Sequence, residues 1–92
     1  MAQRVKTYQF SRRFKKGYKG LPKEIQEAFD KLLPVFLKDM SHPSLGVKRI
    51  QGTRARWEAS ITMKYRFTFE FSEDTLIFRA IGTHDILIQK SR

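Results

Sequence analysis

The sequence predicts an α+β domain in which a helical hairpin packs on one face of a small, mainly antiparallel, twisted sheet. Aromatic residues alternate with polar ones over residues 65–71, which is the period of a half-buried strand. Over residues 25–36, apolar residues instead recur every three or four positions, the period of an amphipathic helix. The helical part precedes most of the strands, and this order is typical of an α+β domain.

The first half of the chain is expected to contain one strand and two helices. Residues 5–10 are rich in Val, Thr, Tyr and Phe and favour a strand. Ser11 is a suitable N-cap for a helix that begins at the next residue, and Gly20 is expected to end that helix. Pro22 favours the first turn of the second helix, whereas Pro34 is expected to kink or divide it.

The second half is expected to form three or four antiparallel strands after a loop at residues 42–46. Alternating patterns predict strands at residues 57–62, 65–71 and 75–81, with a turn at Glu73 and Asp74. A further short strand is expected at residues 86–89. The predicted order is therefore β-α-α-β-β-β, with a last optional strand.

Composition indicates a single domain over residues 1–92 that binds an anionic partner. Lys and Arg number 19 against 9 Asp and Glu, which gives a formal net charge of +10. Such a charge favours nucleic acid, an anionic membrane surface or an acidic protein as partner. The chain has no cysteine, no apolar run approaching ~18 residues and no signal-peptide pattern. We therefore expect a cytoplasmic protein without a membrane segment.

The predicted strands place basic residues on the sheet face that the helices leave open. If the aromatic residues of 65–71 face the helices, Arg66 must face the other way. In the next strand Ala80 has core parity, so Arg79 joins Arg66. His84 follows at the end of that strand, where an imidazole could do acid–base work. The further basic residues expected to contact RNA are Lys48, Arg49, Arg54, Arg56 and Lys64.

Each of these assignments has a structural alternative. Arg66 could form an ordinary cross-strand ion pair with Glu58 or Glu70. His84 could simply hydrogen-bond to Asp85 or to the backbone. The basic residues at 12–19 could be a solvated helix face or could touch ribosomal RNA. A metal site is not expected, because the two histidines have no neighbouring partner ligands.

Several motifs, in this order, resemble those of the RelE/ParE superfamily of bacterial toxins from toxin–antitoxin pairs. The resemblance covers nearly the whole chain and includes a Gly-Thr-His segment similar to that of YafQ-like members. The segments that carry it are YQFS at 8–11, HPSL at 42–45, VKRIQG at 47–52, WEA at 57–59, YRFTF at 65–69 and GTHD at 82–85.

The resemblance implies a toxin that binds the ribosome and cleaves mRNA in the decoding site. An acidic antitoxin would hold it inactive, so the chain would be a monomer or part of a toxin–antitoxin hetero-oligomer. Cleavage would need no metal or other cofactor and would leave a 2′,3′-cyclic phosphate and a 5′-hydroxyl. Arg66 matches the arginine that steadies the phosphate, and His84 matches the acid–base residue. Lys48 and Arg49 lie in the basic strand that contacts RNA.

Two departures from the YafQ-like pattern keep other functions open. That pattern has an arginine four residues before the histidine, where this chain has Ala80. Arg79 is one residue away, and on a regular strand it would point to the opposite face. An aromatic residue after the histidine is replaced by Ile88. The alternatives are a non-catalytic, ParE-like inhibitor of DNA gyrase and an inactive member that only binds its antitoxin.

Overall fold

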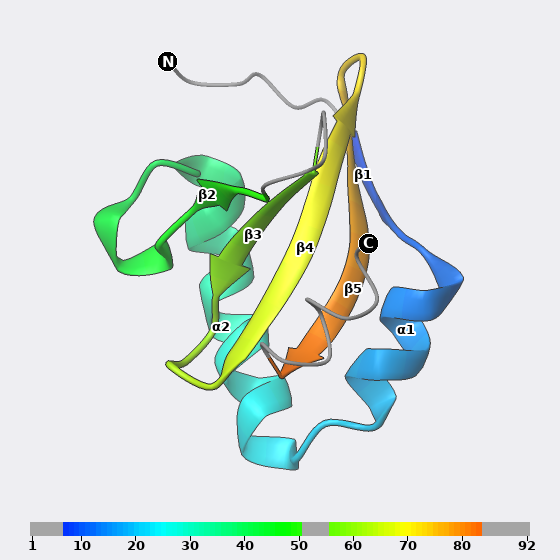
Figure 1. Ribbon diagram of the computed structural model, residues 1–92, viewed down its shortest axis with the longest axis vertical. Coiled ribbons are helices and arrows are strands. Elements are labelled where there is room, and N and C mark those ends of the chain that lie inside the picture. Colours follow the sequence, from blue (N-terminus) through cyan, green and yellow to red (C-terminus); the bar gives the residue numbers. More distant parts are fainter. Residues whose placement is uncertain (1–6, 51–55, 84–92) are drawn as a thin grey trace.

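The computed structural model describes residues 7–50 and 56–83, which form two helices and a five-stranded sheet (Figure 1). The elements, in chain order, are β1 (Thr7–Phe10), α1 (Arg12–Lys19), α2 (Lys23–Lys38), the 3-10 turn η1 (Pro43–Leu45), β2 (Lys48–Arg49), β3 (Arg56–Ser60), β4 (Tyr65–Ser72) and β5 (Thr75–Thr83).

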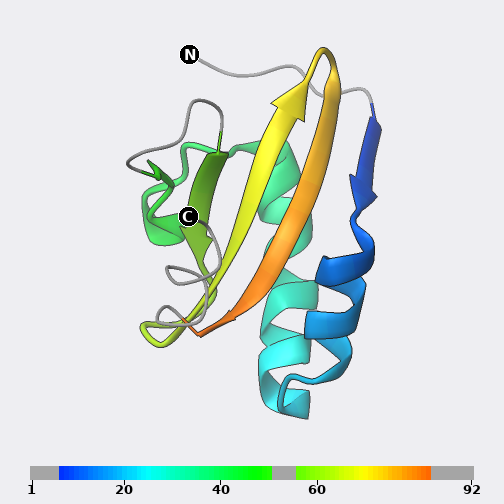
Figure 2. The same ribbon diagram turned by 45° about the vertical axis from the view of Figure 1, so that its right-hand side comes forward.

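The sheet has the strand order β1-β5-β4-β3-β2. The N-terminal strand β1 runs parallel to β5, and all other neighbours are antiparallel. Both helices cover one face and leave the other face without a helix (Figure 2). The predicted fold class is therefore confirmed, with the short strand β2 as an additional element. The strand predicted at residues 86–89 lies outside the described residues.

Ser11 both begins α1 and attaches it to the sheet. Its hydroxyl accepts a hydrogen bond from the Phe14 N–H at 3.0 Å, as the predicted N-cap should. The same hydroxyl donates to the Arg79 carbonyl at 2.8 Å, and the Ser11 N–H donates to the Phe78 carbonyl at 2.9 Å. The start of the first helix is thus fixed against the middle of β5.

The sequence predicts a kink or a division at Pro34, and a division does not occur in the second helix. It runs without interruption from Lys23 to Lys38. A proline inside a helix removes one backbone hydrogen bond, but most helical stability in proteins comes from packing. Phe29 and Phe36, on either side of Pro34, are both buried against the sheet. Their burial holds both halves in one helix.

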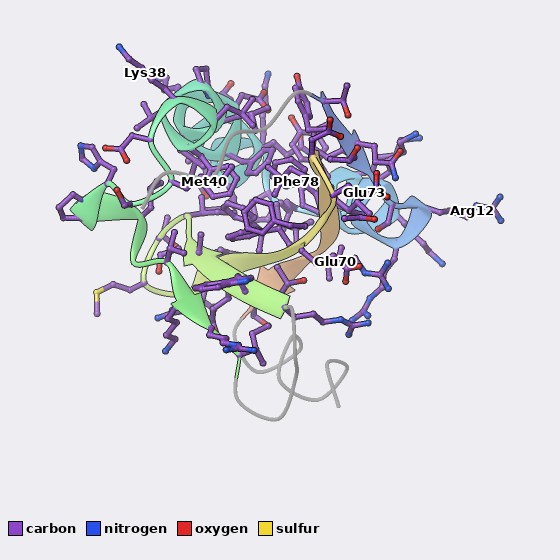
Figure 3. All side chains as sticks on the ribbon, turned by 90° about the horizontal axis from the view of Figure 1, so that it is seen from above. Arg12, Lys38, Met40, Glu70, Glu73 and Phe78 are labelled. Atoms are coloured by element: carbon purple, nitrogen blue, oxygen red, sulfur yellow. The ribbon has the colours of Figure 1, made fainter. Side chains whose placement is uncertain are left out.

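The core between helices and sheet is mainly aromatic. Phe67 and Phe69 of β4 and Leu76 and Phe78 of β5 are buried, as their alternation predicts. The other buried apolar side chains of the core cluster are Phe14, Phe29, Phe36, Leu45, Ala59 and Ile81. Figure 3 looks along the sheet and shows Phe78 on the side of the helices.

A β-bulge in β5 interrupts the predicted alternation. Thr68 of β4 lies opposite Ala80, but the next residue, Phe69, lies opposite Phe78, so Arg79 has no partner in the register. Beyond the bulge, Ile81 lies opposite Phe67 and joins the core. The prediction that Ala80 shares a face with Phe78 is therefore wrong, because the extra residue shifts the parity by one.

Gly17 allows α1 to approach β5 closely. A Cβ at this position would lie 2.8 Å from the Ile81 carbonyl oxygen, a backbone atom that cannot turn away. We expect Gly17→Ala to lower the free energy of unfolding by about 1 kcal/mol or more, because such overpacking outweighs the gain in helix propensity. Gly20→Ala is the matched control, since its Cβ would have its nearest contact at 3.6 Å. Urea unfolding of both variants tests this, and equal stabilities would contradict it.

Candidate functional site

Three arginines gather on the helix-free face of the sheet. Residues directly opposite each other on neighbouring strands share a face. Arg56 lies opposite Glu70, and Arg66 lies opposite Ser60 and Gly82, all on the face opposite Phe67. Arg79 follows the buried Phe78 and lies on the same face as Glu70. Figure 3 shows Glu70 on the side of the sheet away from the helices.

Arg66 is held by an ion pair with Glu58. Its Nη1 donates to the Glu58 Oε2 at 3.1 Å, and the two side chains are only 22% and 11% exposed. The Nε of Arg66 is buried without an acceptor among the described residues. The structural alternative for Arg66 is thus realised, but one contact engages only part of a guanidinium that carries five N–H donors. Arg66 can still bind an anion.

Glu70 connects the other two arginines. Its Oε1 lies 3.5 Å from the Nε of Arg79 and 3.6 Å from the Nε of Arg56. Such partly exposed pairs contribute little stability, but here they keep two cations over the same strand. Strand alternation predicts Arg79 on the helix-free face, and its contact with Glu70 confirms that placement. The bulge changes the residues after Arg79, because it brings Ala80 to the same face, opposite Thr68.

The remaining basic candidates do not all join this group. Lys48 lies opposite Glu58 and shares the helix-free face, whereas Arg49 lies opposite Trp57 and faces the other way. The prediction that both converge on one face is wrong, because neighbouring residues of a strand alternate. Lys64 lies in the exposed turn between β3 and β4. Arg54 and His84 lie outside the described residues.

His42 lies at another part of the molecule. It lines a cleft of about 490 Å³ together with Trp57 and Phe69, which belong to the core side of the sheet. The loop is held by Asp39, which accepts hydrogen bonds from the Ser41 N–H at 3.1 Å and the Ser41 hydroxyl at 2.7 Å. These bonds lower the pKa of the Asp39 carboxyl.

Within residues 7–50 and 56–83, no three His, Cys, Asp or Glu side chains come together as a metal site. No helix there is long and apolar enough to cross a membrane.

Solved structures share this fold. No known family model matches the chain, and no curated protein matches its sequence. RelE in the RelB-RelE complex from Methanococcus jannaschii is 22% identical, with a TM-score of 0.71 over 87% of this chain and 94% of that one. YafQ from E. coli is 18% identical, with a TM-score of 0.75 over 92% and 98%. YoeB from Staphylococcus aureus is 12% identical, with a TM-score of 0.70 over 90% and 99%. The chain therefore has the fold of the RelE, YafQ and YoeB toxins.

Proposed function

We propose that this protein is the toxin of a toxin–antitoxin pair and that it cleaves mRNA on the ribosome. The observation that carries the proposal is that Arg66 and Arg79 lie on the same, helix-free face of a RelE-like fold. A fold alone does not determine an activity, so the argument depends on this group of cations. The formal charge of +10 supports a polyanionic substrate.

The proposed reaction uses the RNA's own 2′-hydroxyl as nucleophile. The bond from O2′ to phosphorus forms while the bond from phosphorus to O5′ breaks, which leaves a 2′,3′-cyclic phosphate and a 5′-hydroxyl. The 2′-hydroxyl proton passes to a base, and the departing O5′ receives a proton from an acid. We assign one of these two proton transfers, as the general acid or the general base, to His84. Arg66 and Arg79 stabilise the charge that develops on the phosphate oxygens.

The proposed partner is an acidic antitoxin that covers the basic face. The similar solved structures include antitoxin–toxin complexes of RelB with RelE and of DinJ with YafQ. Opposite charges speed association and make it sensitive to salt. The antitoxin would therefore compete with RNA for Arg66 and Arg79.

We expect purified protein to create new mRNA 5′ ends on programmed ribosomes. His84→Ala should lower the cleavage rate by about 10²-fold or more, because general acid–base catalysis contributes about 10²–10⁴-fold. Primer extension on the recovered mRNA measures both. The proposal fails if the wild-type protein produces no new ends. The assignment of His84 fails if His84→Ala cleaves like the wild type.

A second candidate function is inhibition of a protein target such as DNA gyrase without catalysis. The observation in its favour is that Arg66 and Arg79 already pair with acids, Glu58 and Glu70. Induction of the gene, with translation and DNA damage followed separately, distinguishes the two. A DNA-damage response that precedes any loss of translation would favour this candidate over RNA cleavage.

A further inference from the structure

A basic cleft lies beside the helix-free face, between α1 and the ends of β4 and β5. We call it the α1 cleft. Its volume is about 780 Å³, and it is lined by Arg12, Arg13, Lys16, Gly17, Gly20, Leu21, Pro22, Tyr65, Ala80, Ile81, Gly82 and Thr83. Figures 1 and 2 show α1 beside β5 along the lower part of that strand. Basic residues therefore line one wall, and strand ends line the other.

Within residues 7–50 and 56–83, no acid forms an ion pair with the basic wall of the cleft. Helix α1 has the sequence RRFKKGYK and contains no acidic residue. Arg13 and Lys16 are exposed, and neither takes part in an ion pair among the described residues. Arg66 and Arg79, in contrast, are each paired with a glutamate. The α1 cleft thus offers cations that no acid of the described residues pairs with.

The cleft is continuous with the candidate site. Gly82, on its floor, lies directly opposite Arg66 in the sheet, and Thr83 lies opposite Tyr65. An extended ligand that contacts Arg66 therefore reaches the cleft by crossing to the neighbouring strand β5. Tyr65 also adds an aromatic ring that is only partly buried.

We propose that the α1 cleft binds the phosphate backbone of single-stranded RNA where the strand continues beyond Arg66. A positively charged groove with an aromatic side chain is the usual arrangement for binding single strands, because phosphates meet the cations and bases stack on the ring. Arg13 and Lys16 contact phosphates, and Tyr65 contacts a base. This proposal rests on the proposed function, since it takes Arg66 as the position of the cut.

RNA fits this surface better than an acidic peptide does. A regular polyanion gains from meeting cations at intervals, and here Arg66 and the basic wall of α1 follow one another. The ring of Tyr65, which lines the cleft, suits a base. Binding of an acidic protein instead of RNA is an outcome that the experiment distinguishes.

The test compares two double variants that remove the same charge from the same helix. Arg13→Ala with Lys16→Ala alters the cleft wall, whereas Lys15→Ala with Lys19→Ala alters residues that do not line the cleft. Fluorescence anisotropy measures binding of the full chain to a labelled single-stranded oligonucleotide with 2′-O-methyl riboses, which cannot be cleaved. We expect the first variant to lower the slope of log K against log salt by about 1.4, because each phosphate contact contributes about 0.7. The control should lose less than half of that.

Three results would overturn the proposal. The first is an equal decrease of the salt slope in the two variants, and the second is no decrease in the first variant. The third is a first variant that binds an acidic peptide more weakly but binds RNA as the wild type does. Thermal melting shows whether both variants fold. Because the oligonucleotide is not cleavable, the result is independent of the ribosome assay. If RNA binding depends on the cleft but no mRNA is cleaved, the proposed nuclease activity is rejected and the cleft proposal stands. If mRNA is cleaved but the two variants lose equal salt slope, the cleft proposal is rejected and the nuclease activity stands.

Discussion

Replacement of Arg66 by glutamine should lower the rate of mRNA cleavage by about 10²–10³-fold. Loss of one positioned donor to a developing negative charge typically has this effect. Arg66 is suited to that role because its ion pair with Glu58 fixes the guanidinium in a largely buried position. Single-turnover cleavage on programmed ribosomes measures the change. Lys31→Ala is the control for net charge, since Lys31 is exposed on α2, which covers the opposite face.

Arg66→Gln also leaves the Glu58 carboxylate without its partner, and this could mimic a catalytic defect. Breaking a buried pair costs up to about 3 kcal/mol of stability when one charge stays behind. Adding Glu58→Gln removes that charge and should restore most of the stability, but it should not restore cleavage. If the double variant Arg66→Gln with Glu58→Gln cleaves like the wild type, Arg66 has no role in the reaction.

Phe78→Ala should destabilise the protein by about 3–5 kcal/mol, the usual cost of truncating a buried phenylalanine. Phe78 is fully buried at the centre of the aromatic core. The rings whose centroids lie within 4.8–6.1 Å of its own are Tyr8, Phe10, Phe14, Phe29, Phe36 and Phe67. This loss is a large part of the free energy of unfolding of a typical domain, which is roughly 5–15 kcal/mol.

Urea unfolding measures this effect, and the slope m shows whether the unfolding transition itself has changed. Phe71→Ala is the control, because Phe71 is half-buried and, among the described residues, its one ring contact is with Phe69 at 5.9 Å. It should lose less than half as much stability. A loss below about 1 kcal/mol for Phe78→Ala would show that the centre of the core lies elsewhere.

Local patterns in the sequence determined most of the elements. Ser11 and Gly20 mark the ends of α1 as predicted, because capping depends on residues within one helical turn. The alternation over residues 65–71 placed Arg66 opposite the aromatic core, since a strand's side chains alternate whatever its neighbours are. The same alternation places Glu70 on the face of Arg66, so this acid of the site could also be read from the sequence.

Only the tertiary structure decided the register and the details of the site. The bulge at Arg79 depends on β4, and the Ser11 hydroxyl that binds the Arg79 carbonyl comes from 68 residues away in the chain. No local pattern contains such a contact. The α1 cleft likewise exists only because Gly17 lets a basic helix pack against β5. Periodicity determines which side chains share a face of one element, whereas the alignment of two elements depends on packing and hydrogen bonds between distant segments.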